Sequence, residues 1–141
     1  MKDPKEVVRA FVAAHNRHDI EALMGFLSED SMMLDVAAPI PLNCKADVRK
    51  LYEMIFTSLP DIHFEITGML GEGNQVFAAF RTTGTGSGQW MGRDITGKPI
   101  DVHEAVHMRI EDGQIRNTMF YSDSATLTKQ LGYQTAVSSK W

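Results

Sequence analysis

The residues best equipped for chemistry lie between 99 and 132, and the most conspicuous of them spell HEAVH at 103–107. H-E-x-x-H is the motif of zinc proteases, in which two histidines one helical turn apart bind the same ion. On a strand the same histidines lie roughly 13 Å apart, too far for one ion to bind both. Val102 and Val106 are β-branched, and the hairpin signal Asp112-Gly113 follows. The sequence therefore predicts a strand, and we expect no metal site and no cofactor.

The hairpin turn also decides which side chains share a face. In a two-residue turn at Asp112-Gly113, Glu111 pairs with Gln114, and each further pair moves one residue outward on both strands. One face then carries Glu104, Val106, Met108, Ile110, Ile115, Asn117, Met119, Tyr121 and Asp123. This face is apolar near the turn and polar at its far end, which is typical of a ligand pocket. His103 and His107 fall on the opposite, polar face unless a β-bulge shifts the alternation.

Asp123 is the leading candidate for catalysis. Beside Glu104 in an apolar site, it can act as a general acid or base on a proton next to a carbonyl group. Tyr121 can then donate a hydrogen bond to the developing enolate oxygen. Each residue has a plainer alternative, because Asp123 can cap the helix that follows it and Tyr121 can be an ordinary strand residue. His15, which ends the first apolar stripe, can share a proton with Asp123 or be purely structural.

The remaining candidates would bind rather than react. Besides the catalytic candidates Asp123 and Tyr121, substrate-binding roles are predicted for Glu104, Asn117, Met119, His15, Trp90 and Met108. Trp90 lies in a glycine-rich segment, where it can cover the pocket mouth or pack against a helix or a partner subunit. Asp35 lies on the same side of a short strand as Met33, and we expect that side to face solvent.

The sequence pattern predicts mainly helices in the first part of the chain and mainly strands in the second. Apolar residues at helical spacing predict helices over about 4–16 and 20–27, the second capped by Asp19, and a third between Asn43 and Leu59. Alternation predicts strands over 31–36, 62–67, 76–85 and on both sides of the hairpin turn, before a last helix over 124–131. Helices first and antiparallel strands afterwards indicate an α+β domain with helices on one face of a curved sheet.

Composition narrows the class of protein. The chain fits a single domain over residues 1–141, with 43% hydrophobic residues. Its net charge of −4 comes without a basic run, so we expect no nucleic-acid partner. No stretch approaches the roughly 18 consecutive apolar residues of a membrane span, and we expect a cytoplasmic protein with no membrane contact. Cys44 is the only cysteine, so an internal disulfide is excluded.

The order of these motifs resembles that of the SnoaL-like polyketide cyclase family, within the nuclear transport factor two-like superfamily. The matching landmarks are HNRHDIEAL, LPDIHFEI, TGTGSGQWMGRDITGK, RIEDGQI and SDSATLTKQLG, which cover roughly residues 6–133. The resemblance implies a cone-shaped, cystatin-like α+β fold, in which three N-terminal helices pack on the concave face of a curved antiparallel or mixed sheet. It also implies a pocket inside the cone, an acid/base residue at the position of Asp123, and homodimers formed through the sheet.

These observations predict a cofactor-independent acid/base enzyme that acts on a small apolar or aromatic carbonyl compound. A polyketide or ester cyclase, an isomerase or a dehydratase would each fit. Two alternatives use the same fold: a non-catalytic small-molecule binding protein and a dimerisation module. The interior distinguishes the three functions. An enzyme would have a cavity with a pair of polar groups, and a carrier would have a cavity without that pair. In a dimerisation module Met108, Met119 and Phe80 would fill the interior.

Overall fold

Helices occupy the start of the chain and long strands its second half. The structure is a computed structural model that describes residues 3–133. Its helices are α1 (Pro4–Asn16), α2 (Ile20–Gly25), α3 (Lys45–Ser58) and α4 (Ser124–Gln130). Its strands are β1 (Leu27–Asp35), β2 (Ala38–Leu42), β3 (His63–Glu72), β4 (Gln75–Thr85), β5 (Gln89–Trp90), β6 (Arg93–Asp94), β7 (Pro99–Glu111) and β8 (Gln114–Ser122). The predicted α+β class is confirmed.

Local sequence explains where the elements begin and turn. Asp19 accepts a hydrogen bond from the backbone N–H of Ala22, so it caps α2 as predicted. The sequence offers Asn43 as the cap of α3, but the helix begins at Lys45 and the half-buried Cys44 occupies the cap position without a side-chain hydrogen bond, so that prediction is wrong. The β7–β8 turn has positive φ at both Asp112 and Gly113, the backbone that a type I′ hairpin turn requires.

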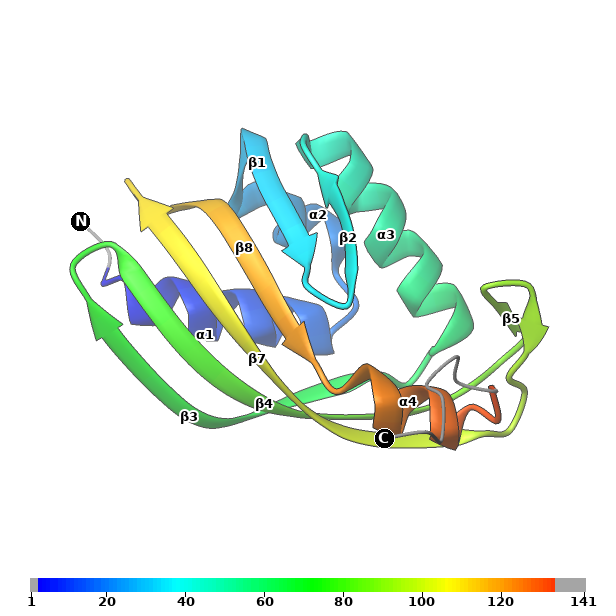
Figure 1. Ribbon diagram of the computed structural model, residues 1–141. Helices are drawn as coiled ribbons and strands as arrows, with labels where there is room; N and C mark the ends of the chain where they lie inside the picture. Colours follow the sequence, from blue (N-terminus) through cyan, green and yellow to red (C-terminus); the bar gives the residue numbers. More distant parts are fainter. Residues whose placement is uncertain (1–2, 134–141) are drawn as a thin grey trace.

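The main sheet is mixed and strongly curved. Its strand order is β2-β1-β8-β7-β4-β3, with β1 parallel to β8 and every other neighbouring pair antiparallel. Figure 1 shows the long strands β4 and β7 bending toward α4, with the small β5–β6 hairpin beyond them. This is the cone-like arrangement that the resemblance implied.

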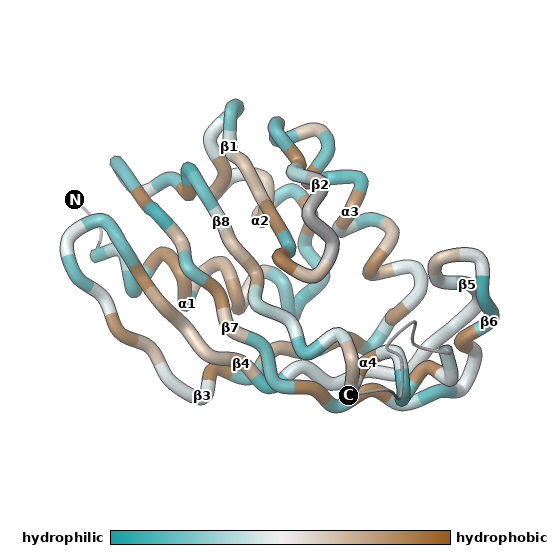
Figure 2. Tube along the Cα trace, in the orientation of Figure 1, coloured by the Kyte–Doolittle hydropathy of each residue, from teal (hydrophilic) through white to brown (hydrophobic). Residues whose placement is uncertain are grey.

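One face of the sheet is covered by helices and forms the core. Along β4 and β7 the even-numbered residues point inward, so Val76, Phe80, Val106 and Met108 are buried against α1 and its neighbours. Figure 2 shows hydrophobic stretches in α1 and alternating colours along the strands, as a half-covered sheet requires. We call this the inner face and the opposite one the outer face. None of the helices within residues 3–133 has the length and apolar character needed to cross a membrane.

Two side-chain amides complete the sheet where a strand has no neighbour. The Asn16 amide donates to the carbonyl of Phe64 (2.9 Å) and accepts from its N–H (2.8 Å) at the β3 edge. The Gln130 amide does the same for Asp101, with both distances 2.9 Å, beyond the point where β8 has ended. Each amide satisfies one backbone donor and one acceptor, as a neighbouring strand would. The α1–α2 corner and α4 are thereby fixed to the sheet.

Candidate functional site

A β-bulge in β8 changes which side chains face the interior. Ile110 pairs with Ile115, but Arg109 pairs with Asn117, so Arg116 is an extra residue on β8. Beyond the bulge every β8 residue lies on the face opposite to the one predicted. The shift moves Asn117 out of the apolar interior, and its amide oxygen accepts hydrogen bonds from Arg109 on the outer face. Burying that amide among apolar side chains would have been unfavourable.

The predicted grouping of Glu104 with Tyr121, Asn117, Met119 and Asp123 is therefore wrong. Glu104 pairs with Ser122, while Tyr121 pairs with Ala105 on the outer face and is 44% exposed. The prediction holds on β7, where Met108 is buried on the inner face with an exposed fraction of 1%.

Three polar side chains meet on the inner face instead. Ser122 Oγ lies 2.9 Å from Glu104 Oε2 and 3.3 Å from Asp35 Oδ2. Asp35 pairs with Phe120 and faces inward with Met33, so the expectation that it faces solvent is wrong. A hydroxyl group has one proton, so Ser122 donates to one carboxylate at a time. All three residues are half-buried, which puts a pair of carboxylates at the accessible end of the inner face.

The wall around Glu104 is apolar and aromatic. Phe80 lies directly opposite Glu104 on β4, and its ring stacks on that of Phe64, with centroids 5.1 Å apart. Tyr52, on α3, is buried in the same interior, and its hydroxyl has no hydrogen-bond partner among the described residues. Burial, with a smaller contribution from the charge of Glu104, raises the pKa of Tyr52, so its phenol stays protonated at neutral pH. The Thr82 hydroxyl on β4 is likewise buried without a partner.

His15 lies deeper, within a box of aromatic rings. Its ring stacks on Phe64 with centroids 3.7 Å apart and an interplanar angle of 2°, and it meets Tyr52 edge-on at 6.0 Å. Removal from solvent lowers the pKa of His15 to about 4, so the ring is neutral near pH 7. Its Nε2 atom is buried and has no partner among the described residues. The structure thus places His15 in the interior, away from Asp123.

Asp123 adopts the capping role that the sequence left open. Its carboxylate accepts hydrogen bonds from the backbone N–H of Thr126 (3.1 Å) and from the Thr126 hydroxyl (2.6 Å), at the start of α4. These hydrogen bonds, chiefly, lower the pKa of Asp123, and the side chain is exposed. A carboxylate stabilised in this way is a weaker base than a free one.

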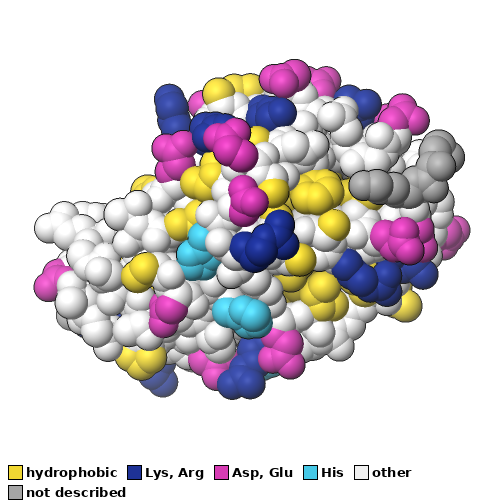
Figure 3. Space-filling view, turned by 180° about the vertical axis from the view of Figure 1, so that it is seen from behind, with side chains coloured by type: hydrophobic (Ala, Val, Ile, Leu, Met, Phe, Trp, Pro, Cys, Tyr) yellow, Lys and Arg dark blue, Asp and Glu magenta, His cyan; other side chains and the backbone are white. Residues whose placement is uncertain are grey.

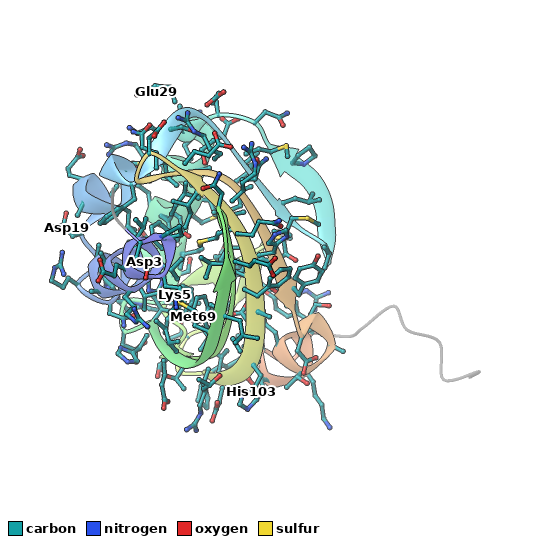
Figure 4. The ribbon with its side chains drawn as sticks, turned by 90° about the vertical axis from the view of Figure 1, so that its left-hand side faces the viewer. Asp3, Lys5, Asp19, Glu29, Met69 and His103 are labelled. Carbon is teal, nitrogen blue, oxygen red and sulfur yellow. The ribbon has the colours of Figure 1, made fainter. Side chains whose placement is uncertain are left out.

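The other candidates divide between the two faces. Trp90 is half-buried against the core, and its carbonyl accepts a hydrogen bond from Tyr133, so this segment is fixed to the end of the described chain. HEAVH lies within β7, as predicted, with His107 on the outer face and stacked on Phe77. Figure 4 shows His103 at the periphery, pointing away from the body of the molecule. Met119 is half-buried on the outer face, not the inner one.

Sequence reasoning missed Ser122, Asp35, Tyr52 and Thr82. Ser122 was assigned to the wrong face because alternation cannot show a bulge. Asp35 was grouped correctly with Met33, but alternation alone does not say which side of β1 faces the interior. Tyr52 looked like one more member of the α3 apolar stripe, and its hydroxyl is a weak signal in a sequence. For Thr82 the signal was available, since its even number places it with Phe80 on β4.

Comparison with known proteins identifies one family and several structures with a similar fold. Residues 5–131 match the model of the SnoaL-like polyketide cyclase family. AclR from Streptomyces galilaeus, a candidate hydroxylase, is similar in structure with a TM-score of 0.82 and 25% identity, over 96% of this chain and 89% of AclR. IdmH from Streptomyces antibioticus, a candidate polyketide cyclase, has a TM-score of 0.80 and 22% identity, over 93% and 99%. A candidate SnoaL-like polyketide cyclase from Jannaschia sp. CCS1 has a TM-score of 0.84 and 15% identity, over 94% and 93%. Among curated proteins none matches significantly.

Proposed function

Because the chain belongs to the SnoaL-like polyketide cyclase family, we propose that it is a cofactor-independent acid/base enzyme acting on a small apolar carbonyl compound inside the cone. The observation that carries this proposal is the position of Glu104. It is a carboxylate on the inner face, opposite Phe80, with a hydrogen bond to Ser122 that fixes one of its oxygens. A carboxylate held in apolar surroundings is a group suited to remove a weakly acidic proton.

In the proposed reaction Glu104 removes a proton from the carbon next to a carbonyl group. The C–H electron pair moves to the carbonyl oxygen, which becomes an enolate oxygen, and the proton stays on Glu104. The hydroxyls of Tyr52 and Thr82 supply hydrogen bonds to that oxygen, since neither has a partner within residues 3–133. In a cyclisation the enolate carbon then bonds to a second carbonyl carbon, and Glu104 returns the proton to the alkoxide that forms.

Proton exchange in heavy water tests this proposal without the natural substrate. The probe is 1-indanone, a small aromatic ketone whose α-protons are replaced by deuterium when it enolises, which proton NMR follows directly. The wild type should accelerate exchange over buffer, and Glu104→Gln should lose at least about 100-fold of that acceleration. Asp123→Asn is the matched control, because asparagine also caps helices and the fold is retained. Exchange that survives in Glu104→Gln but is lost in Asp123→Asn would return the catalytic role to Asp123.

A non-catalytic carrier is the second candidate, and one observation favours it. The acidic residue that the resemblance assigns to catalysis, Asp123, is exposed and engaged by Thr126. If 1-indanone binds to the wild type with no faster exchange than in buffer, the carrier is supported and the enzyme rejected. Binding is followed separately, by quenching of tryptophan fluorescence.

We further propose that the outer face of the sheet pairs with a second copy of the chain. Leu70, Phe77, His107 and Met119 form a row across four strands, in which Leu70 is 78% and Phe77 52% exposed. An open depression of about 910 Å³ lies at one end of this row, beside Arg109. Arg109 interacts with Glu111, and Arg81 with Asp101 at 2.6 Å, so the charges flanking the row are neutralised within one chain. An identical surface would meet no net repulsion. The helix-covered side in Figure 3 instead shows scattered charges of both signs.

A further inference from the structure

The amide of Asn16 fixes the orientation of a neighbouring ring. Its Oδ1 accepts a hydrogen bond from the backbone N–H of Phe64 at 2.8 Å, and its Nδ2 donates to the carbonyl of the same residue at 2.9 Å. Exchanging the two ends of the amide would set donor against donor and acceptor against acceptor. The oxygen of Asn16 is therefore identified by its partners.

This assignment determines where the proton of His15 lies. The Nδ1 atom of His15 is 3.2 Å from Asn16 Oδ1, an oxygen that can only accept, so Nδ1 carries the hydrogen. Because burial lowers the pKa of His15 to about 4, the ring holds one proton near neutral pH. The other nitrogen, Nε2, is then a bare acceptor that cannot donate.

No donor within residues 3–133 reaches that acceptor. Nε2 is fully buried, in a box formed by Phe64, Tyr52 and Phe56, with the Phe56 ring centroid 5.3 Å from that of His15. The Tyr52 hydroxyl, the nearest polar group of the box, is also without a partner. Buried polar atoms in folded proteins are almost always hydrogen-bonded, so two unpaired atoms on adjacent rings call for a functional explanation.

We infer that His15 is a specificity-determining residue, whose Nε2 accepts a hydrogen bond from an O–H or N–H group of the ligand in the cone. This inference rests on the proposed ligand site. A ketone or an ether oxygen cannot satisfy Nε2, because it has no hydrogen to donate, whereas a phenolic or enolic hydroxyl can. Tyr52 has a single hydroxyl proton, which in the proposed reaction is donated in a hydrogen bond to the carbonyl oxygen, so the hydroxyl that Nε2 recognises is a second polar group of the ligand. Phe56, half-buried and stacked on His18, is the most exposed ring of the box and therefore marks the side from which the hydroxyl would enter.

A matched pair of ligands tests the inference. 2-Naphthol and 2-methoxynaphthalene share the same rings, and only the first has a hydrogen to donate. The wild type should bind 2-naphthol at least tenfold more tightly, measured by calorimetry at pH 7. His15→Phe keeps a ring against Phe64 but removes the acceptor, so the two ligands should then bind within about twofold of each other. Asp123→Asn, which changes only the exposed cap of α4, should keep the full preference for 2-naphthol.

A second measurement needs no variant. Nitrogen-15 NMR of the wild type, labelled in histidine, should show the His15 proton on Nδ1, and the Nε2 resonance should shift when 2-naphthol is added. Equal affinities for the two ligands in the wild type, a preference that persists in His15→Phe, or a proton on Nε2 in the free protein would each overturn the inference. Failure of the Glu104 proposal has a different signature, which is α-proton exchange that survives in Glu104→Gln.

Discussion

The inner and outer sides of the sheet differ in how completely their polar side chains are hydrogen-bonded. On the outer face most polar groups find partners within the chain, as His107 does with Gln75 at 2.7 Å and Arg109 does with Asn117. Four buried polar side-chain atoms have no partner among the described residues. Three of them, the Tyr52 and Thr82 hydroxyls and His15 Nε2, lie in the helix-covered interior, and the fourth is Arg116 Nε at the bulge. The interior therefore holds most of the buried polar atoms that lack a partner, and it is the side of the sheet on which we propose that a ligand binds.

One extra residue decides which β8 side chains lie on each face. Arg116 puts Thr118, Phe120 and Ser122 on the inner face and leaves β7 unchanged. Bulges are common near functional sites because they redirect a side chain without altering the rest of the sheet. The register of β8 therefore determines which of its side chains face the interior, and substitutions on the two faces can test that register.

The largest expected effect is a loss of stability on shortening a buried methionine. Without the bulge Met108 and Met119 would lie on the same face, whereas with it they lie on opposite faces. Met108→Ala removes a buried inner side chain and should lower the free energy of unfolding by about 3 kcal/mol. Met119→Ala, on the outer face, should cost less than about 1 kcal/mol. Urea denaturation of both variants beside the wild type measures the two losses. Equal losses, or a larger loss at Met119, would contradict the bulge.

The next effect concerns the neutral histidine of the interior. His15 has a pKa of about 4 in the folded protein against 6.5 when exposed, so between these values the unfolded chain binds more protons. The contribution of His15 to the free energy of unfolding is then fully present above pH 6.5, and it falls by up to about 3 kcal/mol as the pH is lowered toward 4. His15→Phe should remove this part of the pH dependence, as measured by urea denaturation at pH 7 and pH 4.5.

Tyr52→Phe is the control for that experiment. It removes a buried polar group of the same box, but one whose pKa lies far above the range tested. Its stability should therefore follow the pH dependence of the wild type. A pH dependence that is unchanged in His15→Phe would show that another group is responsible.

The smallest effect on stability belongs to the outer face. Phe77→Ser should lower the unfolding free energy of the single chain by only about 1 kcal/mol, because the side chain is already half exposed and loses chiefly its stacking on His107. It should nevertheless weaken the proposed dimer and lower the mass measured by light scattering. Thr67→Ser, at an exposed position outside the row, is the control. A dimer that persists in Phe77→Ser, or a wild type that is monomeric, would reject pairing through this face.

Much of the fold could be predicted, because local patterns specify it. The first helix matches its predicted bounds, Asp19 caps the second, and the turn at Asp112-Gly113 and the strand through HEAVH are confirmed. Each depends on neighbours in the sequence: helical spacing, a capping side chain, or a dipeptide that tolerates positive φ. The family resemblance supplied the curvature of the sheet, which these patterns do not specify.

The candidate site was harder to predict, because it depends on contacts between distant segments. The face that β8 presents depends on the bulge at Arg116, and the parallel pairing of β8 with β1 places Met33 beside Thr118 and Asp35 beside Phe120. Asp35 and Ser122 meet only through that pairing. Asn16 is recognisable as a constraint on His15 only once β3 lies beside α1. Counting residues along one strand cannot reveal any of these contacts.

The two amides that complete the sheet also protect it from other molecules. An open strand edge is a template on which a neighbouring chain can add a strand, and proteins commonly block such edges with proline, charge or bulges. Here Asn16 occupies both backbone groups of Phe64, and Gln130 occupies those of Asp101, so an extended segment from outside finds nothing to pair with at either position. The contacts that hold two helices in place thus also block strand addition at these two positions of the sheet.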